Sequence, residues 1–88
     1  MKRIIFSKHA WEDYTSWQNQ DKKTLKKINS LIKDIQSSPY EGIGKPEPLK
    51  HDLAGLWSRR IDREHRLVYS VEEEDILIYS CRYHYDNK

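Results

Sequence analysis

The chain has 88 residues, which is enough for one domain with one hydrophobic core. Lys and Arg number 16 against 14 Asp and Glu, so the net charge of +2 does not by itself indicate a nucleic-acid-binding protein. The single cysteine, Cys81, excludes an internal disulfide, and no apolar run approaches the ~20 residues of a membrane span. We therefore expect one cytoplasmic domain over residues 1–88 with no membrane contact.

The N-terminal half predicts one strand and two helices. The segment KRIIF is β-branched and aromatic, as in a short strand, and Ser7 can cap the helix that follows. Residues 8–20 form that helix, because large aromatic side chains recur in it near helical spacing: Trp11, Tyr14 and Trp17. Asp21 can cap a second helix, whose buried face is marked by Leu25, Ile28, Leu31, Ile32 and Ile35.

The basic residues are segregated along the chain. Apart from Lys88, every lysine lies at or before Lys50, whereas five of the six arginines follow Trp57. Arginine binds phosphate oxygens through a planar fork, whereas lysine acts as a mobile point charge. We therefore expect two kinds of basic surface. On the second helix the ordinary interpretation is a solvated lysine face, and a surface that follows phosphates is the alternative.

The segment YEGIGKPEPLK, residues 40–50, has too much Gly and Pro for helix or strand and predicts a constrained loop. Pro46 and Pro48 hold Glu47 between rigid neighbours, so this side chain is either an exposed acidic residue or a carboxylate fixed over a site.

The remaining segments predict strands: LWSRRID, HRLVYSV and ILIYSCRYHY, with the turn of a hairpin at Glu72 to Asp75. Their alternation is imperfect and leaves the register of this hairpin open. The order of elements predicts an α+β domain, with the N-terminal strand and two helices packed on a mainly antiparallel, twisted sheet.

The residue types suit phosphodiester cleavage without a metal or other cofactor, although Glu, Arg and His are common residues and a histidine at the end of a strand is more often a structural hydrogen-bonding group. The four histidines lack metal-ligand spacing, and Cys81 is expected to be a buried apolar residue. RNA supplies its own nucleophile, the 2′-OH, so an enzyme needs a base, a cation at the phosphate and an acid. Carboxylate, arginine and histidine match these roles, and an aromatic ring can stack on a base. The candidates are Glu47, Arg59, Arg63, Arg66, Arg82, His84 and Tyr85.

The segments GKPEPLKHDLAGLWSRRIDREHRLVY (residues 44–69) and CRYHY (residues 81–85) closely resemble the YoeB (Txe) toxins, a branch of the RelE superfamily of bacterial toxin–antitoxin systems. The likeness continues through both predicted helices. The resemblance implies a microbial-ribonuclease-like fold and an endoribonuclease that cuts mRNA in the A site of the 70S ribosome. It also implies a YefM-like antitoxin as partner, and a homodimer.

The resemblance assigns roles to individual residues. Glu47 corresponds to the general base, Arg66 to the group that stabilises the transition state, His84 to the acid and Tyr85 to the residue that orients the nucleotide. We expect secondary contacts with RNA from Lys50, Arg59, Arg63 and Arg82. Relatives commonly stop near the His-Tyr pair, whereas this chain continues through Asp86, whose charge can alter that of His84.

Two other functions stay open at this point. One is a non-enzymatic toxin on the same scaffold, such as a ParE-like gyrase poison or a remnant retained as an antitoxin partner. A gyrase poison has no need for Glu47, His84 and Tyr85 together, and it should produce DNA breaks while translation continues. The other is an RNA-binding protein without catalysis, which would use the same arginines.

Overall fold

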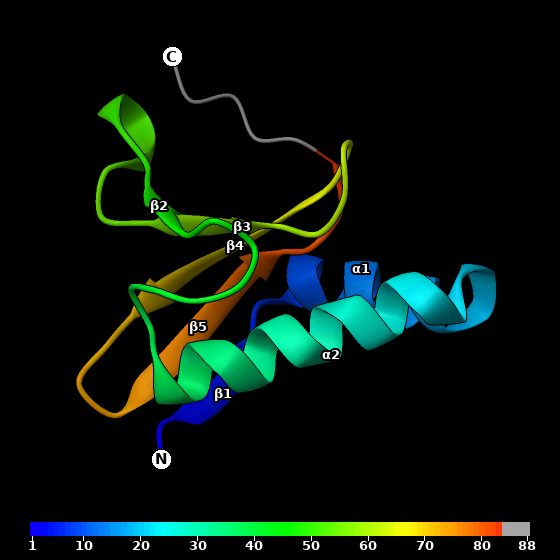
Figure 1. Ribbon diagram of the computed structural model, residues 1–88, viewed down its shortest axis with the longest axis horizontal. Coiled ribbons are helices and arrows are strands. Elements are labelled where there is room, and N and C mark those ends of the chain that lie inside the picture. The colour runs from blue at the N-terminus through cyan, green and yellow to red at the C-terminus, as the bar shows by residue number, and fades with distance from the viewer. Residues whose placement is uncertain (84–88) are drawn as a thin grey trace.

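The computed structural model describes residues 1–83, in which two helices lie against one face of a five-stranded sheet (Figure 1). The elements in chain order are β1 (Arg3–Phe6), α1 (Lys8–Gln20), α2 (Lys22–Ser37), β2 (Glu47–Pro48), the 3-10 helix η1 (His51–Leu53), β3 (Trp57–Arg60), β4 (Arg66–Val71) and β5 (Asp75–Ser80). The sheet order is β1-β5-β4-β3-β2, with β1 parallel to β5 and the other pairs antiparallel. The predicted α+β class is confirmed.

Both helices begin at the capping residues expected from the sequence. The Ser7 side chain accepts a hydrogen bond from the backbone N–H of Ala10, and Asp21 accepts from the first turn of α2. The two helices and the strands behind them enclose one core, which includes Trp17, Ile28, Leu31, Ile35, Leu67, Tyr69, Ile76 and Ile78. Within residues 1–83, no helix is long and apolar enough to cross a membrane.

The loop expected over residues 40–50 contains a short strand, which corrects the prediction. Glu47 and Pro48 form β2, in which Glu47 lies opposite Ser58 and Pro48 opposite Trp57 of β3. Proline lacks an N–H but is tolerated in an edge strand, and the flanking prolines favour the extended backbone that pairing requires. The rigid segment therefore places Glu47 in the register of the sheet.

The β4–β5 hairpin turns where the sequence predicted. The backbone N–H of Glu72 donates to Asp75 O at 2.8 Å. Val68 lies opposite Ser80 and Tyr69 opposite Ile78, which leaves Tyr79 as the extra residue of a β-bulge. The bulge interrupts the alternation, and this is why the sequence pattern left the register open. The last strand was expected to continue through residue 85, but β5 ends at Ser80.

Arg59 is fully buried on the helix-facing side of β3. Its guanidinium forms an ion pair with Asp34 of α2, with 2.5 Å between Nη1 and Oδ2. It also donates to the Tyr69 hydroxyl and to three carbonyls of the segment after α2, those of Ser38, Glu41 and Ile43. These bonds fasten the segment that leads to Glu47. They also leave the side chain no access to RNA, so its expected RNA contact does not fit the structure.

The ion pair predicts how stability depends on pH. The hydrogen bond from Arg59, assisted by one from the Ile43 N–H, lowers the pKa of Asp34 below its ordinary value of 3.8. Because the folded-state pKa is the lower one, this stabilisation is complete above pH 3.8 and is lost as the pH falls through the folded value. Urea denaturation between pH 6 and pH 2 should show a steep acid limb that Asp34→Asn flattens. An equally steep limb in the variant would contradict this assignment.

Candidate active site

Glu47 and Arg66, two of the expected catalytic residues, meet on the face of the sheet that the helices leave open. Leu67 and Tyr69 of β4 belong to the core beneath the helices, so Arg66 projects from the opposite face by strand alternation. The Arg66 Nη1 atom lies 3.4 Å from the Glu47 Oε1 atom. The Glu47 side chain is 51% exposed and that of Arg66 is 14% exposed. An accessible carboxylate thus lies beside a sheltered cation, although the two residues are 19 positions apart.

Arg60 adds charge to this open face, and the sequence reasoning did not select it. It is exposed and lies directly opposite Arg66 in the register of β3 and β4, and opposed residues project from the same face. The sequence pattern around β3 did contain the information that Arg60 faces outward. Trp57 and Ile61 are apolar and share their parity with Arg59, so Arg59 belongs to the covered face and Arg60 to the open one.

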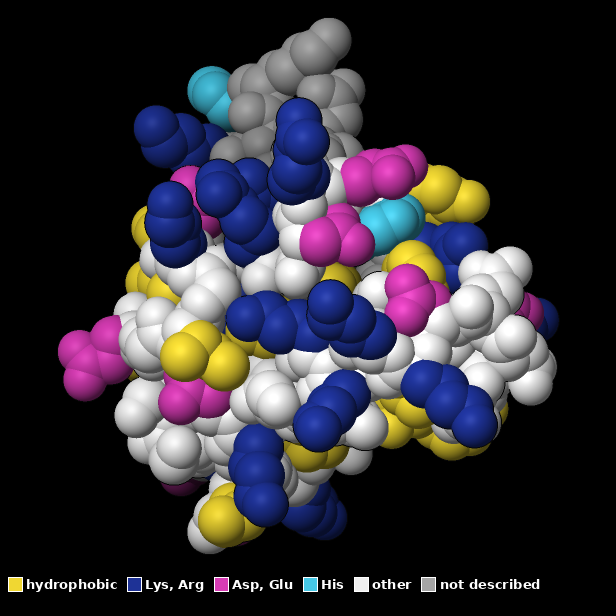
Figure 2. Space-filling view, turned by 45° about the vertical axis from the view of Figure 1, so that its right-hand side comes forward, with side chains coloured by type: hydrophobic (Ala, Val, Ile, Leu, Met, Phe, Trp, Pro, Cys, Tyr) yellow, Lys and Arg dark blue, Asp and Glu magenta, His cyan; other side chains and the backbone are white. Residues whose placement is uncertain are grey.

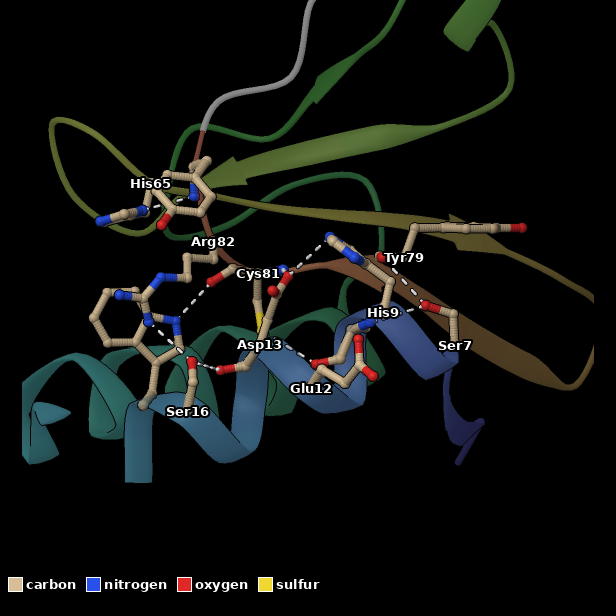
Figure 3. Close-up of polar contacts among 12 residues, drawn as sticks. Ser7, His9, Glu12, Asp13, Ser16, His65, Tyr79, Cys81 and Arg82 are labelled. Carbon is tan, nitrogen blue, oxygen red and sulfur yellow. Dashed lines mark hydrogen bonds and ion pairs between the residues drawn. The ribbon is translucent and has the colours of Figure 1, made fainter. Parts of the chain in front are cut away.

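The other residues expected to contact RNA differ in their exposure: two lie on the surface, and one packs against α1. Lys50 follows β2, Arg63 lies between β3 and β4, and both are exposed. The half-buried Arg82 lies over the ring of Trp17, 4.2 Å from its centroid, and donates a hydrogen bond to Ser16 Oγ of α1 (Figure 3). It also donates to Gln20 Oε1 of the same helix. Arg82 therefore braces the chain against α1.

The segment after β5, residues 81–83, is held by contacts outside the sheet ladder. The Cys81 N–H donates to Asp13 Oδ2 at 3.0 Å, and the Trp17 indole donates to the Cys81 carbonyl at 2.9 Å (Figure 3). Two residues on, the carbonyl of Tyr83 accepts from the backbone N–H of Arg66 at 3.1 Å. The chain is thus directed from α1 to the first residue of β4, the strand that carries one half of the ion pair.

His84 and Tyr85 lie outside the described residues, so their roles stay predictions. Their immediate predecessor, Tyr83, is bonded to the backbone of Arg66. Within residues 1–83, no group of three or more His, Cys, Asp and Glu side chains is placed to hold a metal ion.

The thiol of Cys81 should be unreactive in the folded protein. It is fully buried, and burial, together with the nearby Asp13 carboxylate, raises the pKa of the thiol to about 12. Only the thiolate reacts with alkylating or disulfide reagents. We therefore expect an aromatic disulfide reagent at pH 8 to label Cys81 at least 100-fold more slowly than in the protein unfolded by guanidinium. Equal rates in the two states would show that residues 81–83 do not remain packed on α1.

Comparison with known proteins identifies close relatives over almost the whole length. The family model described as "YoeB-like toxin of bacterial type II toxin-antitoxin system" matches residues 6–85. Toxin YoeB of Escherichia coli strain K12 is 59% identical over 83 residues, covering 94% of this chain and 99% of that protein. The YoeB dimer from Staphylococcus aureus superposes with a TM-score of 0.89 at 55% identity, covering 96% of this chain and 98% of that one. A YoeB–YefM complex from the same organism gives a TM-score of 0.88 at 53% identity, with 97% and 99% covered.

Proposed function

Because this chain belongs to the family of YoeB-like toxins of bacterial type II toxin–antitoxin systems, we propose that it is a ribosome-dependent endoribonuclease that cuts mRNA in the A site. The observation that carries the proposal is the contact between Glu47 and Arg66 on the open face of the sheet. A base and a phosphate-binding cation side by side are two of the three groups that metal-free cleavage of RNA needs.

The proposed reaction proceeds by attack of the 2′-OH on the adjacent phosphorus. The Glu47 carboxylate takes the proton of the 2′-OH, and its accessibility allows the ribose to approach. The Arg66 guanidinium stabilises the charge that develops on the phosphate oxygens. His84 protonates the leaving 5′-oxygen, and Tyr85 stacks on or orients the nucleotide. The products are a cyclic phosphate and a 5′-OH end, and no cofactor takes part.

The basic exterior supports docking on ribosomal RNA. Figure 2 shows basic side chains spread over the face of the molecule that includes α2. The exposed lysines of this helix are Lys22, Lys23, Lys26, Lys27 and Lys33. Contacts of this kind with phosphates release counterions, so binding to ribosomes should weaken steeply as the salt concentration rises.

Two protein partners follow from the relatives. The Staphylococcus aureus structures contain a YoeB dimer and YoeB bound to YefM. We propose a YefM-like antitoxin and a second copy of the chain as partners of this toxin.

The test is in vitro translation with the purified protein, in which mRNA ends are mapped by primer extension. We expect cuts within codons that occupy the A site, and we expect His84→Ala to abolish them. Arrested translation without cuts would instead favour an RNA-binding protein that does not cleave. Unaffected translation accompanied by DNA breaks would favour a gyrase poison.

A further inference from the structure

His65 is a buried histidine at the end of the β3–β4 connection, and the proposed reaction does not use it. Only 8% of it is exposed, and its ring meets the Trp17 ring edge-on with 4.9 Å between centroids. The carboxylate of Asp62 accepts hydrogen bonds from the backbone N–H groups of Glu64 and His65, which fixes the turn. The imidazole is therefore held in place by both its backbone and its ring.

The imidazole accepts a short hydrogen bond from the main chain of Tyr83. The backbone nitrogen of Tyr83 lies 2.7 Å from the Nδ1 atom of His65 and donates its hydrogen to it. Because a backbone N–H can only donate, Nδ1 must carry the lone pair and Nε2 the proton, so the ring is neutral in this arrangement.

Tyr83 is thus held on both sides of its Cα atom. Its N–H is bound by His65 and its carbonyl by the Arg66 N–H. The Tyr83 carbonyl belongs to the same planar peptide unit as the nitrogen of His84, so holding it sets the direction in which the chain continues. Tyr83 also has a φ of 64°, a left-handed conformation that a non-glycine residue keeps only where its surroundings hold it.

We propose that His65 is a positioning residue, whose Nδ1 atom fixes the main chain of Tyr83, the residue directly before His84 in the sequence, and thereby supports cleavage. The inference rests on the proposed function, because it concerns the residue that precedes two of the proposed catalytic groups in the chain. His65 itself does not contact the RNA. Its contribution is geometric, and a displacement of about 1 Å in a catalytic group can cost about 100-fold in rate.

A pair of matched variants tests this role. In His65→Asn the amide oxygen is bonded to Cγ, as Nδ1 is in histidine, and can accept from Tyr83. In His65→Gln the oxygen lies one carbon further out. Both variants lose the ring and its packing on Trp17, so a purely structural role predicts equal defects. We expect single-turnover cleavage on the ribosome to fall about 100-fold in His65→Gln with little change in KM, and His65→Asn to recover at least 10-fold of that loss.

A second measurement does not depend on cleavage. Hydrogen exchange of the Tyr83 amide, followed by NMR, should be slow in the wild type and in His65→Asn but at least 10-fold faster in His65→Gln. The imidazole nitrogen shifts of the wild-type protein should show the proton of His65 on Nε2.

Failure of the positioning role and failure of the proposed function give different experimental results. If the wild type cleaves and His65→Gln cleaves at the same rate, the positioning role is wrong, and equal losses in both variants would likewise overturn it. If the wild type does not cleave, the proposed function is wrong. The exchange measurement then decides whether His65 holds Tyr83, and unchanged exchange in His65→Gln would show that it does not.

Discussion

Glu47→Gln should lower the rate of ribosome-dependent mRNA cleavage by about 100- to 10,000-fold, which is the contribution usually made by a general base. The amide keeps the size of the side chain and can still accept a hydrogen bond from Arg66, 3.4 Å away in the wild type, but it cannot take the proton of the 2′-OH. The rate should be measured in single-turnover reactions on programmed ribosomes. Binding of the variant to ribosomes should be retained, because the substitution does not remove a positive charge.

Glu73→Gln is the matched control. Glu73 is exposed in the β4–β5 turn, at the opposite end of β4 from Arg66, and its substitution removes the same charge. Its cleavage rate should remain within about twofold of the wild type, which corresponds to the usual small effect of a surface substitution. Comparable losses of cleavage rate in the two variants would show that the effect comes from the change in net charge and that Glu47 is not the general base.

Arg59→Met should lower the free energy of unfolding by about 3–5 kcal/mol, a large part of the 5–15 kcal/mol that stabilises a typical domain. Methionine fills similar space but leaves Asp34 without its cation and removes the hydrogen bonds to three carbonyls. Urea denaturation monitored by tryptophan fluorescence measures this loss.

Arg60→Met, one residue further along β3, should leave the free energy of unfolding almost unchanged. Arg60 is exposed on the open face, so its loss should change the stability by no more than about 0.5 kcal/mol. The same variant should weaken binding to RNA phosphates and reduce the salt dependence of binding, whereas Arg59→Met should do so only through unfolding. If Arg60→Met proved the more destabilising of the two, the faces assigned to β3 would be wrong.

The helices could be predicted almost residue by residue because local rules determine them. Ser7 and Asp21 are capping residues in front of apolar patterns of helical period, and the structure begins α1 and α2 behind them. The α+β class followed from the order of the elements. The family resemblance named four candidate catalytic residues, of which Glu47 and Arg66 are described by the structure and lie side by side.

The features that the sequence did not reveal depend on partners distant along the chain. The bulge at Tyr79 exists only in relation to Val68 and Tyr69 of the facing strand, so no local pattern specified the register. The end of β5 is set by Asp13 and Trp17, which bind the main chain of Cys81 from α1.

The burial of Arg59 was not predicted, for a different reason. A buried arginine violates the expectation that this residue type lies on the surface, and only the parity of its neighbours indicated otherwise.

The parallel pairing of β1 with β5 has a consequence for the order of events during biosynthesis. The first strand to be made, β1, is joined to β5, the last strand within residues 1–83, across 72 positions at the Arg3–Asp75 ion pair. Helices can form as the chain emerges, but this edge of the sheet stays open until residues 75–80 have been translated. The hydrogen bonds that hold Cys81 to α1 and Tyr83 to His65 and Arg66 form later still. The packing of residues 81–83 therefore belongs to the last stage of folding, after both helices and the β4–β5 hairpin can already have formed.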